Sequence, residues 1–173
     1  MMLVVLAASL SWRGGDRRDR RVVDIAAAGN AHSEADHGYA GEGASVGAAN
    51  GKTFRQTRGW MRYSLAVFGD TEVTVACTFL GSAGVPLTYD ILIEDRLVAT
   101  RTFTAPSSTP VVVDFTVPFG ITRGMTNIVV TIRARGGVTP ALLELRTVQD
   151  HLEDTKLSLA TSLRSQTLRG SDQ

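Results

Sequence analysis

Residues 32–51, which read HSEADHGYAGEGASVGAANG, hold the densest group of side chains that could carry out chemistry. The acids and histidines among them are His32, Glu34, Asp36, His37 and Glu42. Imidazoles and carboxylates ligate metal ions, and paired carboxylates hydrolyse glycosidic bonds. The stretch therefore indicates a metal site, a catalytic cluster, or a glycine-rich loop that these side chains hold in place.

A zinc site fits this stretch poorly. On a strand, His32 and Glu34 would share one side, but His37 falls out of that phase, and the glycines indicate irregular backbone. Calcium fits better, because it accepts flexible cages of carboxylate and carbonyl oxygens. We expect no obligatory cofactor, with calcium as the candidate ion. Glu34, His37 and Glu42 are the residues expected to hold that ion or to organise the loop.

Catalysis by this stretch needs a shaped cleft as well as carboxylates. Glu34, Asp36 and Glu42 would have to supply two carboxyl groups about 5 to 10 Å apart to hydrolyse a sugar bond. Carboxylates are common in glycine-rich loops, so the main expectation is a long loop across one edge of the fold. In that loop Glu34 and His37 hydrogen-bond backbone groups and fix it to the core.

Trp60 is the side chain best suited to contact a sugar. It is out of phase with Met61 and Tyr63, so it is expected on the outer face or at the edge of a sheet. An exposed tryptophan ring can stack on a sugar, or it can cover a small cluster under a loop. If a sugar binds, the predicted contacts are Trp60, Arg55 and Asp90.

The bulk numbers exclude several classes of protein. A single cysteine excludes an internal disulfide framework and any multi-cysteine zinc site. That residue, Cys77, stands between Val75 and Phe79 in a strand pattern, so we expect a buried thiol rather than a nucleophile. The net charge of +1 gives no argument for nucleic acid, and no apolar run approaches the roughly 20 residues that cross a membrane.

Hydrophobic residues alternate with polar ones along most of the chain, and this period of two is typical of half-buried strands. Met61, Tyr63 and Leu65 form one such row. Turn signals such as FGDT, GSAGVP and ARGGVTP separate the rows, and no helical pattern lies between them. The fold class is therefore all-β, an antiparallel β-sandwich or jelly roll. The predicted strands are 22–26, 59–68, 72–80, 87–94, 97–104, 110–117, 126–134 and 141–148.

The chain divides into a leader at 1–21, a β-sandwich module at 22–150 and a polar tail at 151–173. We expect the leader to be disordered and the tail to be a short helix or disordered. The apolar start MMLVVLAASLSW has the length of a signal-peptide core, but its arginines follow it instead of preceding it. The compartment stays open: secreted or periplasmic if this run is a signal, otherwise cytoplasmic.

A series of short motifs resembles the C-terminal β-sandwich module of beta-L-arabinofuranosidase-type glycoside hydrolases. It begins with Glu34-x-x-His37, followed by GEGASVG, NGKTFR and GWMRY. The later segments CTFLGSAGVPLTYDILIEDRLVATRTF and VPFGITRGMTNIVVTIRARGG continue the same order, so the resemblance covers about 22–150. The chain departs from it at Leu80, where tryptophan is usual, at Thr88, where arginine is common, and at the 94–96 turn.

The resemblance implies an accessory domain without the family's catalytic parts, which lie in a separate helical barrel with a cysteine nucleophile. The same layout resembles galactose-binding-like carbohydrate modules. The prediction is a non-catalytic module that packs against a glycoside hydrolase catalytic domain or binds plant-type, arabinose-containing carbohydrate. Two alternatives stay open: a metal- or carboxylate-dependent hydrolase that uses residues 32–42, and a purely structural interaction module. Neither nucleic acid nor a membrane is an expected partner.

Overall fold

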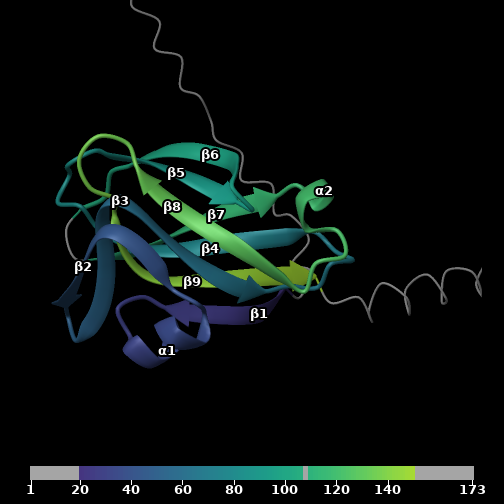
Figure 1. Cartoon of the computed structure of the whole chain (residues 1–173). Helices are drawn as coiled ribbons and strands as arrows, with labels where there is room; N and C mark the ends of the chain where they lie inside the picture. The colour runs from purple at the N-terminus through teal and green to yellow at the C-terminus, as the bar shows by residue number, and fades with distance from the viewer. Residues whose placement is uncertain (1–19, 107–108, 151–173) are drawn as a thin grey trace, which may run out of the picture.

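The structure is a computed structural model that describes residues 20–106 and 109–150. These residues form nine strands and two short helices (Figure 1). In chain order they are β1 (Arg20–Ala27), α1 (Ala31–Asp36), β2 (Ala40–Ala49), β3 (Lys52–Ala66), β4 (Val73–Leu80), β5 (Leu87–Ile93), β6 (Arg96–Phe103), β7 (Pro110–Val117), α2 (Phe119–Thr122), β8 (Asn127–Ala134) and β9 (Ala141–Asp150). Neither helix in these ranges is long and apolar enough to cross a membrane.

The strands pair antiparallel and pack as two layers, which Figure 1 shows one above the other. One layer, the β3–β8 sheet, contains β2, β3, β8, β5 and β6, and the other, the β9–β4 sheet, contains β1, β9, β4 and β7. The long strand β3 joins them, because its second half pairs with β8 while Arg55 pairs with Leu142 of β9. The predicted antiparallel β-sandwich is confirmed.

The core lies between the layers and is built from the predicted alternating rows. Met61, Tyr63 and Leu65 of β3 are fully buried, and so is Cys77 of β4. Burial raises the pKa of the Cys77 thiol, which keeps it protonated and inert, as expected. The other large, fully buried side chains are Phe79, Tyr89, Ile91, Ile93, Ile128, Ile132, Leu142, Leu145 and Val73.

The prediction of a long loop over residues 32–51 is wrong. Its first part forms α1, where the Asn30 side chain accepts a hydrogen bond from the Ser33 backbone nitrogen at the helix start. Its second part forms β2, which pairs with β3 along most of its length. Alanine and glycine have low strand propensity, so β2 is a strand because of its partner and not because of its own sequence.

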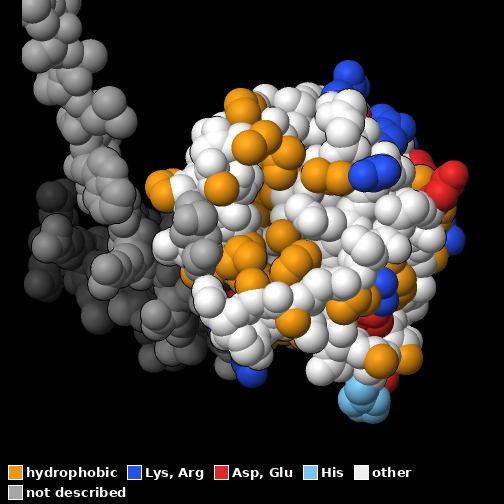
Figure 2. Space-filling view, turned by 90° about the vertical axis from the view of Figure 1, so that its left-hand side faces the viewer, with side chains coloured by type: hydrophobic (Ala, Val, Ile, Leu, Met, Phe, Trp, Pro, Cys, Tyr) orange, Lys and Arg blue, Asp and Glu red, His pale blue; other side chains and the backbone are white. Residues whose placement is uncertain are grey.

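The termini of the sandwich also differ slightly from prediction. β1 begins at Arg20, inside the predicted leader, and β9 continues to Asp150. The rest of the leader and the tail, residues 1–19 and 151–173, lie outside the described residues. Figure 2 shows the end of the sandwich that lies on the left in Figure 1, where hydrophobic side chains form separate patches and charged side chains gather mainly toward the right of the view.

Candidate functional site

Glu34 of α1 and Arg55 of β3 form a largely buried ion pair. Arg55 donates from Nε to Oε1 at 2.7 Å and from Nη2 to Oε2 at 2.6 Å, and the two side chains are only 18% and 7% exposed. Tyr63 donates from its hydroxyl to Oε1 at 3.3 Å, and the Tyr39 ring centroid lies 4.4 Å from the Arg55 guanidinium carbon. We call Glu34, Tyr39, Arg55 and Tyr63 the closed cluster.

The closed cluster keeps its charges because each one has a partner. Burial alone raises the pKa of the Glu34 carboxyl, but hydrogen bonds from Arg55 and the Gly29 nitrogen lower that pKa further than burial raises it. Burial and the nearby Glu34 charge raise the pKa of Tyr63. The predicted role of Glu34 in organising this region fits its contact with Gly29 at 2.7 Å.

His37 forms a second anchor between α1 and β1. Its Nδ1 lies 2.6 Å from the Ser33 carbonyl oxygen, and its Nε2 lies 3.2 Å from Oδ1 of Asp24. Both neighbours are hydrogen-bond acceptors, so the doubly protonated ring can donate to both of them at once, which favours the charged form. Burial lowers the pKa of His37, but the bonds to Ser33 and Asp24 outweigh burial and raise that pKa.

The Ser33, His37 and Asp24 side chains resemble a hydrolytic triad in composition only. The Ser33 hydroxyl lies 3.4 Å from His37 Nδ1 and already accepts from the Ala27 backbone nitrogen at 2.9 Å. A triad needs a neutral histidine nitrogen that accepts the serine proton, whereas Nδ1 here faces the Ser33 carbonyl oxygen. Ser33, His37 and Asp24 therefore do not form a serine-type hydrolytic triad.

The three residues predicted to hold calcium do not converge. Glu34 belongs to the closed cluster, His37 faces Asp24, and Glu42 accepts from the Trp60 indole. Within the described ranges, no group of three or more His, Cys, Asp or Glu side chains is arranged to hold a metal ion. Glu34 and His37 therefore act in this structure as anchors for α1 and for the strand that follows it.

Trp60 lies on the outer face of the β3–β8 sheet, beside a hollow of about 220 Å³. Its indole nitrogen donates to Oε2 of Glu42 at 3.0 Å, which fixes the ring, and the Arg62 guanidinium carbon lies 5.3 Å from the ring centroid. We call this the Trp60 hollow. Its lining residues are Trp60, Arg62, Leu92, Asp95, Thr131 and Arg133.

A buried carboxylate positions the arginines at this face. Asp90 is fully buried and accepts from Arg133 at 2.9 Å, from Arg135 at 2.7 Å and from Thr100 at 2.7 Å. Burial on its own raises the pKa of Asp90, but the bonds from Arg135, Thr100 and Arg133 outweigh it and lower that pKa to about 2. The two arginine side chains stay 49% and 51% exposed. We call Asp90, Thr100, Arg133 and Arg135 the open cluster.

The structure separates the three predicted sugar contacts. Trp60 lines the hollow, Arg55 lies in the closed cluster, and Asp90 lies beneath Arg133. Sequence reasoning missed the cross-strand register that sets Trp60 opposite Arg133 and Arg133 opposite Asp90. Arg62 could have been found, because residues two apart on a strand share a face.

Residues 18–148 match a family described as "Family of unknown function (DUF6805)". No curated protein has a significant match to the sequence.

Solved structures show the same fold at low sequence identity. A family 35 carbohydrate binding module from Clostridium thermocellum has a TM-score of 0.50 and 8% identity, over 74% of this chain and 96% of that one. A family 35 module from an environmental isolate has a TM-score of 0.51 and 14% identity, over 66% and 92%. An exo-beta-1,3-galactanase from Phanerochaete chrysosporium, solved with galactose, has a TM-score of 0.50 and 10% identity, over 71% of this chain and 28% of that one.

Proposed function

This chain belongs to the DUF6805 family, and we propose that it is a non-catalytic carbohydrate-binding module that works beside a glycoside hydrolase. We further propose that residues 20–150, which extend the predicted module by the start of β1, are its folded unit, and that its ligand is a plant-type polysaccharide containing arabinose. The partner is the catalytic domain of a glycoside hydrolase, against which the module packs or to whose substrate it binds.

The Trp60 hollow is the observation that carries this proposal. The indole ring of Trp60 is held by a hydrogen bond to Glu42, so the tryptophan side chain loses little conformational freedom when a sugar stacks on it. Asp95 and Thr131 supply oxygen acceptors at the margin, while Arg62 and Arg133 supply donors. A fixed aromatic surface beside a few convergent polar groups is the composition that binds a small polar ligand with a defined orientation.

The fold supports the proposal in a coarser way. Two of the solved structures with this fold are named as carbohydrate binding modules, and a third is a galactanase solved with galactose. The resemblance to the module of arabinofuranosidase-type hydrolases supports arabinose as the sugar and a hydrolase as the partner. The binding residues that we propose are Trp60, Arg62, Asp95 and Arg133, with Asp90 positioning Arg133.

Calorimetric titration of the full chain tests the function. The probes are L-arabinose, galactose and arabino-oligosaccharides, each with and without calcium. We expect saturable heat with an arabinose-containing probe and a loss of at least tenfold in affinity in Trp60→Ala. Phe68→Ala is the matched control, because Phe68 is an exposed aromatic residue that does not line the hollow. Absence of heat with every probe would contradict the proposal and favour a structural interaction module.

A further inference from the structure

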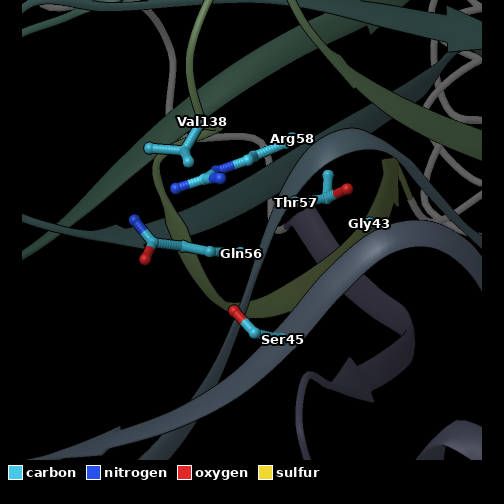
Figure 3. A pocket seen from close by; sticks show the side chains of 6 residues that line it. All are labelled: Gly43, Ser45, Gln56, Thr57, Arg58 and Val138. Carbon is cyan, nitrogen blue, oxygen red and sulfur yellow. The ribbon is translucent and has the colours of Figure 1, made fainter.

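A second hollow lies directly along β3 from the first. It has a volume of about 500 Å³, and we call it the Arg58 hollow. Figure 3 shows the side chains of Gln56, Arg58 and Val138 reaching into the same space from β3 and from the loop after β8. Its lining residues are Gly43, Ser45, Gln56, Thr57, Arg58 and Val138.

The walls of the Arg58 hollow are held in place by hydrogen bonds. Gln56 donates from Nε2 to the Thr139 carbonyl oxygen at 3.2 Å, and the Thr57 backbone nitrogen donates to the Thr139 hydroxyl at 3.1 Å. The Thr139 nitrogen in turn donates to the Thr57 carbonyl at 2.9 Å. These bonds fix the loop that follows β8 against β3, so the hollow is a formed feature of the fold.

The two hollows share one strand, on which a glycine lies between their lining residues. Alternate residues of β3 line them, Gln56 and Arg58 in one and Trp60 and Arg62 in the other. Gly59 separates Arg58 from Trp60, and a Cβ at that position would come within 2.7 Å of the Glu42 carbonyl oxygen. Gly43 lies opposite on β2, at the register shift. On β3, Gly59 thus places no side chain between Arg58 and Trp60, and on β2 the Glu42 side chain stands beside the Trp60 indole.

Two exposed arginines lie along this strand, and the guanidinium of one of them, Arg62, lies over the Trp60 ring. Within the described ranges, neither Arg58 nor Arg62 has a carboxylate within ion-pair distance, and both are exposed. Guanidinium groups donate several hydrogen bonds in a fixed plane, which suits the paired hydroxyl groups of a sugar chain. Gln56, Ser45 and Thr131 add neutral polar groups at both ends of the stretch.

We infer that the Arg58 and Trp60 hollows form one track for an internal stretch of a polysaccharide chain, and not a pocket for a single terminal sugar. This inference rests on the proposed carbohydrate-binding function. From Gln56 to Arg62 the strand extends roughly 20 Å at about 3.3 Å per residue, which is several sugar residues long. Trp60 provides the stacking surface, and Arg58 binds the sugars farther along the chain.

A length series tests the track. Arabino-oligosaccharides and galacto-oligosaccharides of one to six sugars are titrated into the full-length wild type and the variants Arg58→Ala, Trp60→Ala and Arg123→Ala. Arg123 is the control, because it is an exposed arginine after α2 that lines neither hollow. We expect wild-type affinity to rise at least tenfold from the monosaccharide to the hexasaccharide. Arg58→Ala should lose most of that gain while binding the monosaccharide as wild type does, and Arg123→Ala should match wild type.

The outcomes separate the two proposals. Equal affinity for every chain length, or hexasaccharide binding by Arg58→Ala equal to that of wild type, would overturn the track. If either result is found and Trp60→Ala still loses binding, the proposed carbohydrate-binding function stands without the track. A wild type that binds no member of either series would overturn the proposed function first, and the track with it.

Discussion

The closed cluster and the open cluster use the same chemistry with opposite exposure. In each, a carboxylate that is almost or fully buried accepts hydrogen bonds from arginine. In the closed cluster the carboxylate comes from α1, and only 18% of the Arg55 side chain is exposed. In the open cluster Asp90 is completely buried, but about half of Arg133 and Arg135 faces solvent. Under the proposed function, the exposure of the arginine, and not the presence of an ion pair, distinguishes an anchor from a ligand-binding group.

The two clusters also differ in what surrounds the arginines. Tyr39 lies against the Arg55 guanidinium, so its flat face is already occupied by protein. Arg133 lines a hollow beside Trp60, and its Nη2 is held by Asp90, so the rest of the group is presented at a fixed angle. A preoriented donor loses little freedom when a ligand binds. Stability is thus expected to depend on the closed cluster, and affinity on the open one.

Removing the closed-cluster charge should give the largest effect on stability. Glu34→Gln leaves the Arg55 guanidinium buried without its counter-charge, so the free energy of unfolding should fall by about 3 kcal/mol. Urea denaturation followed by far-UV circular dichroism measures this loss. Glu42→Gln is the matched control, because Glu42 is exposed, and it should change stability by less than about 0.5 kcal/mol. Equal losses of stability in the two variants would show that the closed cluster is not a special anchor of the fold.

Asp90→Asn should have a smaller effect on stability and should also weaken binding. It removes the carboxylate that orients Arg133 and Arg135, but those groups remain partly hydrated, so the expected loss of stability is about 2 kcal/mol. Affinity for a bound oligosaccharide should fall about fivefold, which corresponds to roughly 1 kcal/mol. Denaturation and calorimetry on the same sample measure both. Unchanged affinity would show that the open cluster is another anchor.

The Asp90 carboxylate should also make the stability of the protein depend on pH in the acidic range. The pKa of Asp90 is lowered to about 2 in the folded state, below the usual value for an unfolded chain. A lowered folded pKa contributes stability that is complete above the unfolded pKa and is lost as pH falls toward the folded pKa. Wild type should therefore lose stability between about pH 4 and pH 2 more steeply than Asp90→Asn does. Parallel pH profiles for the two proteins would contradict the assigned pKa.

Replacing His37 should have the smallest effect on stability, and its contribution should be lost as pH rises, whereas that of Asp90 is lost as pH falls. Its pKa is raised by Ser33 and Asp24, so its contribution is complete below the unfolded pKa and is lost as pH rises through the folded pKa. His37→Gln should cost about 1 kcal/mol near pH 6 and less at higher pH. Thermal denaturation at a series of pH values measures this. A constant difference across pH would show that folding does not raise the pKa of His37.

The sequence predicts the core better than it predicts the site. Alternation alone identifies Met61, Tyr63 and Leu65 as inward, because a half-buried strand must separate its faces. It fails for β2, whose alanines and glycines carry no strand signal and depend on β3 as a partner. It fails equally for α1, a six-residue helix too short for a visible period.

The candidate site depends on which strands pair with each other, and no local sequence pattern predicts that. Arg55 and Asp90 are both charged residues on strands, yet Arg55 pairs with Glu34 of α1 while Asp90 pairs with Arg133 of β8. Their separation follows from which strand each neighbours, and that is decided by the topology of the whole sandwich. Trp60 is the exception, since its phase relative to Met61 already places it outside the core.

The fluorescence of Trp60 reports whether a bound sugar contacts this side chain. The chain has two tryptophans, and Trp12→Phe leaves Trp60 as the single emitter. This variant is titrated with arabino-oligosaccharides while heat is recorded on a parallel sample. A sugar that stacks on Trp60 should change its emission in a saturable way, with the same dissociation constant as the heat. Saturable heat without any change in Trp60 emission would show that the sugar binds elsewhere and would contradict binding in the Trp60 hollow.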